Sequence, residues 1–119
     1  MTGVRGRLAA AAVISVAALS LASCSSSDSS ATAVAASCQK VVGVLSNGPD
    51  PDADPVGYAE AQYHPLAALH LRDTTVNTDA HRLGRAFHAV FTSNGSAVSA
   101  TALAKAEKVI DRVCPGATS

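Results

Sequence analysis

The sequence predicts an all-α protein, a small up-down bundle of about four helices stapled by one disulfide. Apolar residues recur every three or four positions in four stretches, and few segments alternate apolar with polar residues. Breaks rich in Gly, Pro and Asn separate these stretches. Only two Tyr, two Phe and no Trp are present, so the core is thin and a small domain of this kind needs a covalent staple.

The N-terminal residues 1–23 are typical of an export signal. Arg5 and Arg7 precede an apolar run from Leu8 to Leu21, and no acidic residue interrupts them. The run is shorter than the roughly 20 residues that span a bilayer. It therefore predicts a signal peptide that is removed, not a permanent membrane helix.

The next segment combines a cleavage motif with a polar stretch. Leu21, Ala22, Ser23 and Cys24 resemble the lipobox of bacterial lipoproteins. The resemblance implies cleavage before Cys24 and a lipid on its thiol, which would hold the protein on the outer side of the cell membrane. Residues 24–32 hold no large apolar side chain and are predicted to be this lipidated cysteine and a flexible, disordered Ser-rich tether.

Residues 33–119 are predicted to form the helical domain. The first helix covers about 33–46, with an apolar stripe of Val34, Cys38, Val41 and Leu45. Asp54 then caps a second helix that starts at Pro55 and continues to about Arg72. Pro65 removes a backbone donor inside it, so we expect a kink or a short break there.

Two further helices follow. The third begins at about Asp79, and its apolar stripe is Ala80, Leu83, Phe87 and Val90, with Phe91 at the edge. Asn94 and Gly95 end it. The fourth starts between Ser96 and Ser99 and continues to Cys114, before Pro115 and Gly116.

The two remaining cysteines are predicted to pair. Short loops make sequential helices antiparallel, so the start of the first helix and the end of the fourth are neighbours in an up-down bundle. Cys38 and Cys114 lie at those places, and an exported protein meets oxidising conditions. The alternative is two reduced, buried thiols.

Charge and composition exclude one class of partner. Residues 1–23 contain two of the nine basic residues and none of the nine acidic ones, so the rest has a net charge of −2 with His neutral. A nucleic-acid surface needs clustered basic residues with aromatics among them. We therefore expect no nucleic-acid partner.

Metal sites are also not expected. Asp50, Asp52 and Asp54 alternate as in a calcium loop, but Pro55 stands where such a loop needs Gly and Ala61 where it needs Glu. The four histidines, His64, His70, His81 and His88, do not form a three-ligand cluster by spacing. His81 and His88 lie about 10 Å apart along a helix, with Arg85 between them.

No catalytic motif stands out. A Gly-x-Ser-x-Gly pattern is absent from the sequence, and Glu107 with Arg112 and Lys108 with Asp111 are typical of surface helix charges. We therefore expect no enzymatic activity and no cofactor.

A weaker likeness covers most of the exported part. The stretch from Asp54 to Glu60, with Gln62, Pro65 and Leu66, and the ending Val113 to Gly116 resemble small helical lipoproteins of high-GC Gram-positive bacteria. The resemblance implies a fold and a location but no activity.

The resulting hypothesis is a non-enzymatic interaction module that contacts another envelope component. Its possible interaction face is the polar side of the third helix, with His81, Arg82, Arg85 and His88. The alternative is a carrier of a small ligand or metal that uses the histidines or a cavity in the bundle.

Overall fold

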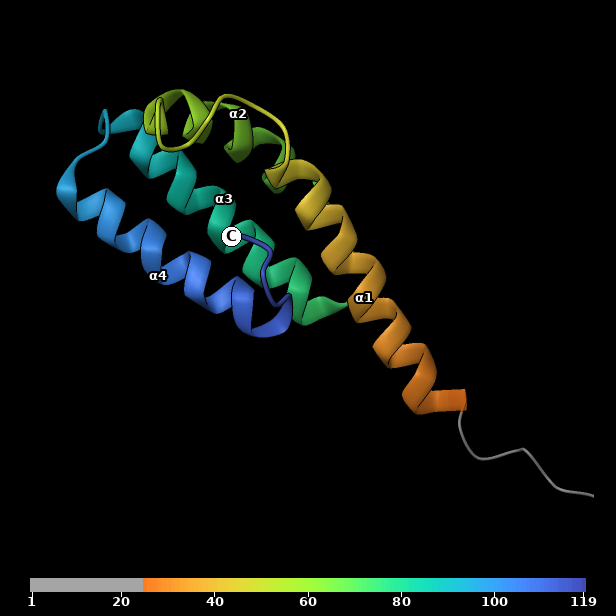
Figure 1. The fold of residues 1–119 in the computed structure, drawn as a ribbon. Helices are drawn as coiled ribbons and strands as arrows, with labels where there is room; N and C mark the ends of the chain where they lie inside the picture. The colour runs from red at the N-terminus through yellow and green to blue at the C-terminus, as the bar shows by residue number, and fades with distance from the viewer. Residues whose placement is uncertain (1–24) are drawn as a thin grey trace, which may run out of the picture.

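The computed structural model describes residues 25–119, which form four α-helices and no strand within that range (Figure 1). The helices are α1 (Ser25–Leu45), α2 (Pro55–Ala67), α3 (Thr74–Thr92) and α4 (Ala97–Val113). This confirms the predicted all-α fold of four helices. The signal peptide predicted for 1–23 and the lipidation predicted for Cys24 lie outside the described residues.

α3 is the central helix. Its contacts with α2 and with α4 are the most extensive between helices. The buried apolar side chains of α3 are those of the four predicted stripe residues and of one more, Val76, a turn earlier. Gly84 lets α2 approach closely, since a Cβ at that position would lie only 3.1 Å from the Cβ of Leu66.

α1 is longer than the sequence pattern indicated. Residues 25–32, which we expected to be a flexible tether, form about two turns at its start. These turns project past the other helices in Figure 1. Extending a helix that packing has already nucleated costs little, and the alanines of the following turns favour helix strongly. The domain therefore begins one residue after Cys24, without an intervening coil.

α2 is shorter than predicted and α3 begins earlier. α2 ends at Ala67, two residues after Pro65, so the proline terminates the helix instead of kinking it. Backbone N–H groups of Ala68 and Leu69 close the last turn by donating to His64 and Leu66 at 3.0 and 3.3 Å.

The early start of α3 has a local cause. Asp73 accepts a hydrogen bond from the Val76 N–H at 2.8 Å, which caps a helix that begins at Thr74. The sequence pattern predicts a start at about Asp79, because residues 73–78 include several residue types that favour caps and the apolar stripe begins at Ala80. Val76 is fully buried, and its burial with this cap stabilises the additional turn.

The other predicted helix ends are confirmed. The carboxylate of Asp54 accepts from the Gly57 N–H at 2.8 Å, and the Ser96 hydroxyl accepts from the Ser99 N–H at 3.3 Å. Asn94 and Gly95 both have positive φ, 51° and 75°, a conformation that ends helices. α4 then starts at Ala97, within the predicted range.

The predicted disulfide is confirmed: Cys38 and Cys114 are bonded, with their Cα atoms 5.4 Å apart. α1 and α4 run in opposite directions, as expected (Figure 1). They share little direct packing, however, because α1 lies mainly against α2 and α3. Cys114 follows the last residue of α4, so the bond joins α1 to the end of α4 without an interface along both helices.

Candidate functional site

The predicted interaction face on α3 is partly engaged within the protein. His81 is half-buried, and its Nε2 lies 2.7 Å from the Leu69 carbonyl oxygen. Arg82 pairs with the buried carboxylate of Asp79 at 3.2 Å. Arg85 and His88 are exposed. The exposed part of this face therefore includes Arg85 and His88, whereas His81 joins α3 to the segment after α2 and Arg82 pairs within α3.

A ring cluster that the sequence pattern did not indicate lies where α2 meets α3. The half-buried Tyr63 ring is 3.9 Å from the ring of His64, 4.8 Å from that of His88 and 5.7 Å from that of Phe91. The sequence pattern places His88 on the polar side of the third helix. The structure brings Tyr63 and His88 together because Tyr63 lies at the edge of the α2–α3 contact.

The histidines and aspartates do not assemble into a metal centre in the part of the chain that the structure describes. No group of three or more His, Cys, Asp or Glu there could hold a metal ion. Two loop carboxylates accept hydrogen bonds from backbone N–H groups instead. Asp50 accepts from the Asp52 N–H at 2.9 Å, and Asp54 caps α2.

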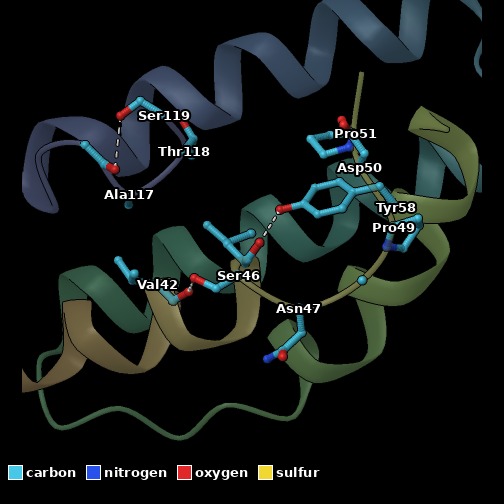
Figure 2. A pocket seen from close by; sticks show the side chains of 13 residues that line it. Val42, Ser46, Asn47, Pro49, Asp50, Pro51, Tyr58, Ala117, Thr118 and Ser119 are labelled. Carbon is cyan, nitrogen blue, oxygen red and sulfur yellow. Dashed lines mark hydrogen bonds between the residues drawn. The ribbon is translucent and has the colours of Figure 1, made fainter. Parts of the chain in front are cut away.

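The main concave feature is a cleft between α1, the α1–α2 loop and the segment after α4, which we call the α1–α4 cleft. It consists of three adjoining pockets. The middle pocket, about 390 Å³, is shown in Figure 2, where the ring of Tyr58 lies beside the loop and residues 117–119 lie across from α1. Its lining is Val42, Leu45, Ser46, Asn47, Gly48, Pro49, Asp50, Pro51, Tyr58, Gly116, Ala117, Thr118 and Ser119.

Hydrogen bonds hold the walls of the middle pocket. Tyr58 donates to the Leu45 carbonyl oxygen at 2.7 Å, which joins α2 to the end of α1. On the opposite wall, Asp111 accepts from the backbone N–H of Thr118 at 3.0 Å and from its hydroxyl at 2.6 Å. Ala117 is buried, so the segment after α4 folds back onto the bundle.

The inner pocket is acidic. It has a volume of about 260 Å³ and is lined by Leu45, Pro51, Asp52, Tyr58, Phe87, Glu107 and Thr118. Burial, and to a smaller extent the nearby Asp111, raises the pKa of the Glu107 carboxyl. Burial, and to a smaller extent Glu107, raises the pKa of the Tyr58 hydroxyl. Both shifts disfavour the negatively charged form of the group, and burial is the larger cause of each.

The outer pocket is apolar. It has a volume of about 420 Å³ and is lined by Ala31, Val34, Ala35, Cys38, Val42, Val113, Cys114 and Pro115. Val42 belongs to both the outer and the middle pocket, and its side chain is exposed. The cleft therefore passes from an apolar end on α1 to a polar, acidic end beside Tyr58.

Glu107 is a residue of this site whose position follows from the helical spacing of the sequence. Leu103, Glu107, Ile110 and Cys114 are spaced by four, three and four residues, so Glu107 lies on the inward face of α4. We had assigned it to the surface because of its charge. The loop and the residues after Pro115 gave no such signal, since irregular segments have no periodicity.

No helix in the described part is long and apolar enough to cross a membrane. Comparison with protein families, with curated proteins and with solved structures finds no match for the chain.

Proposed function

We propose that this protein is an exported lipoprotein, held on the outer side of the cell membrane by lipid on Cys24, and that it acts there as a non-enzymatic binding module. The N-terminal pattern of residues 1–24 supports the anchor. The role of the rest is to present a small, crosslinked helical surface to another envelope component.

The observation that carries the proposal is the Cys38–Cys114 bond. It joins residues 76 positions apart. Disulfides persist in oxidising compartments and are rare in the reducing cytosol. A structural disulfide in a chain that begins with an export pattern therefore supports a location outside the cytoplasm by a second, independent line of argument.

The start of α1 supports a role close to the membrane. Ser25 is the first residue of α1 and directly follows the cysteine of the lipobox. A helix rises about 1.5 Å per residue, so the packed part of the domain at Val41 is at most about 25 Å from the anchor. The binding surfaces would thus reach partners at or near the bilayer.

The α1–α4 cleft favours the second candidate function, a carrier of a small ligand. Its middle and outer pockets fall in the size range of small-molecule sites. A site made of the histidines has less support, because His81 is hydrogen-bonded to the Leu69 carbonyl and the rings of His64 and His88 lie against the Tyr63 ring.

The anchor is tested by the Cys24→Ala variant of the full chain. We expect the native protein to partition into detergent and to carry the mass of an attached lipid, and the variant to lose lipidation and normal cleavage. The matched control is Cys38→Ser with Cys114→Ser, which should keep the lipid. A Cys24→Ala protein cut at the same bond and still found in the detergent phase would refute the proposal.

The interaction role is tested by crosslinking in intact cells. A photoreactive residue replaces Arg85 or His88 on the exposed part of the α3 face, and the control position is Lys108 on α4. We expect one envelope protein to be captured from the α3 positions and not from Lys108. Equal capture from all three would argue against a specific face.

A further inference from the structure

The α1–α4 cleft has a polarity along α1 that matches that of a lipid in a membrane leaflet. All eight residues that line its outer pocket are apolar, and this pocket begins at Ala31. The middle pocket, which starts near Val42, offers hydroxyl, amide and carboxylate groups from residues such as Ser46, Asn47 and Asp50. The apolar end is therefore the end nearer to Cys24.

The packing of α1 explains why this groove is open. α1 lies mainly against α2 and α3, and only the disulfide ties it firmly to the end of α4. In a fully closed bundle, the side chains of Ala35 and Val42 would be covered by α4. Here both are exposed, so an apolar strip along α1 has no covering helix.

Charge restricts the occupant further. No Lys, Arg or His lines any of the three pockets, whereas Asp50, Asp52 and Glu107 do. An anionic head group would be repelled at the polar end, and a positively charged group would be attracted. Aromatic rings of Tyr58 and Phe87 line the same end, and such rings also favour cations.

The apolar end of the cleft lies close to the proposed membrane anchor, which indicates that the ligand comes from the membrane. Ser25 and Ala31 are six residues apart, about 9 Å along a helix. The head-group layer on each side of a bilayer is roughly 5–7 Å thick. If Cys24 is anchored and α1 stands along the membrane normal, the apolar mouth of the groove is therefore just above the leaflet in which the anchor lies.

We propose that the α1–α4 cleft binds a single-chain amphiphile from the adjacent leaflet, with a zwitterionic or cationic head. The acyl chain lies in the outer pocket between α1 and residues 113–115, and the head lies in the middle and inner pockets near Tyr58 and Glu107. The inference rests on the proposed lipid anchor for the source of the ligand.

The test uses the full chain, purified with its own lipid and placed in phosphatidylcholine vesicles. The probe is lysophosphatidylcholine with a photoreactive group at the end of its acyl chain, and labelled peptides are identified by mass spectrometry. We expect labelling within residues 31–42 and 113–115. The same photoreactive chain on lysophosphatidylglycerol, which is anionic, should label these peptides less.

Two variants at exposed positions block the groove without disturbing the core. Val42→Asp places a charge in it, and Ala35→Trp fills it. Each should reduce labelling by roughly tenfold, the change in binding that about 1.4 kcal/mol produces. Val98→Asp is the matched control, since Val98 is 83% exposed on α4 and lines none of the three pockets of the cleft.

Several results would overturn the inference. Unchanged labelling in both groove variants, or labelling elsewhere on the chain, would remove the site. Equal labelling by the anionic probe would contradict the proposed zwitterionic or cationic head group. A dimer in solution whose interface covers α1 would show that a second copy of the protein, and not a lipid, occupies the groove. If native protein carries no lipid on Cys24, the proposed function fails by itself, whereas a lipidated protein with an unlabelled groove defeats only this inference.

Discussion

α1 and the unit formed by α2, α3 and α4 are held in place by different forces. Among the largest fully buried side chains of the described part, only Val41 belongs to α1, whereas Phe87, Leu66, Leu83 and Ile110 all belong to the other helices. α2 and α4 thus pack on α3 through a shared apolar core. α1 adds the fully buried Val41 and the partly buried Val34, Val44 and Leu45 to this core, and it is also held by a disulfide and a few polar contacts.

These polar contacts lie at two places along α1. The buried Ser37 hydroxyl accepts from the Asp73 N–H at 3.2 Å, at the start of α3. At the other end, Tyr58 donates to the Leu45 carbonyl, and the Gln62 side chain donates to the Asn47 carbonyl. Among the described residues, α1 adds fewer fully buried side chains to the shared core than α3 does, and α1 is also the helix that the disulfide holds. Because α1 shares little packing with α4, the cleft between them stays open.

The largest effect is expected in the core of α3. Leu83→Ala removes a fully buried side chain and should lower the free energy of unfolding by about 2–5 kcal/mol. Denaturant unfolding followed by circular dichroism measures this. The control Val98→Ala, at an exposed position, should change it by less than about 0.5 kcal/mol. Equal effects would mean that α3 is not the centre of the fold.

Breaking the disulfide should have a somewhat smaller effect, concentrated in α1. A crosslink between residues 76 apart removes unfolded-chain entropy worth about 4.5 kcal/mol in the simple model, and strain reduces such values, so we expect a loss of about 2–4 kcal/mol on reduction.

Hydrogen exchange sharpens this prediction. After reduction, backbone amides of α1 should exchange faster than those of α3. The disulfide helps to hold α1 against the domain, whereas α3 is held by the buried core. The Cys38→Ser, Cys114→Ser double variant should resemble the reduced protein and not respond to reductant. An unchanged melting curve, or equal loss of protection in α1 and α3, would contradict the division between the two regions.

The smallest effect is expected at Glu107 and depends on pH. Since its folded-state pKa is raised above the ordinary 4.5, the folded state holds this proton more tightly than the unfolded state. The contribution of Glu107 to the free energy of unfolding is therefore fully present below pH 4.5 and is lost as the pH rises through the raised pKa. Glu107→Gln should raise the melting temperature slightly at neutral pH and not at pH values below 4.5.

A second measurement on this variant tests the link to Tyr58. Removing the Glu107 charge should lower the Tyr58 pKa part of the way toward 10.0, since burial, the larger cause, remains. Ultraviolet titration of the phenol reports it. Glu60→Gln, at an exposed glutamate of α2, is the control. A Tyr58 titration identical in all three proteins would contradict the proximity of Glu107 to the inner pocket.

Local patterns in the sequence were sufficient for the elements themselves. The apolar stripe of α3, the cap Asp54, the start of α4 and the turn at Asn94 and Gly95 were all predicted correctly. Each depends on residues within a few positions of one another. The errors were also local: Pro65 ended α2 early, and Asp73 started α3 early.

Helical periodicity and short loops in the sequence were sufficient to predict the apolar stripe of α3 and the pairing of Cys38 with Cys114. The tertiary structure was needed to show that α1 packs on α2 and α3 and shares little packing with α4. Periodicity shows that a face is apolar but not which neighbour covers it or how completely. The α1–α4 cleft also needs the loop at 49–51 and residues 116–119, whose positions depend on hydrogen bonds such as that of Thr118 to Asp111 and on burial of Ala117.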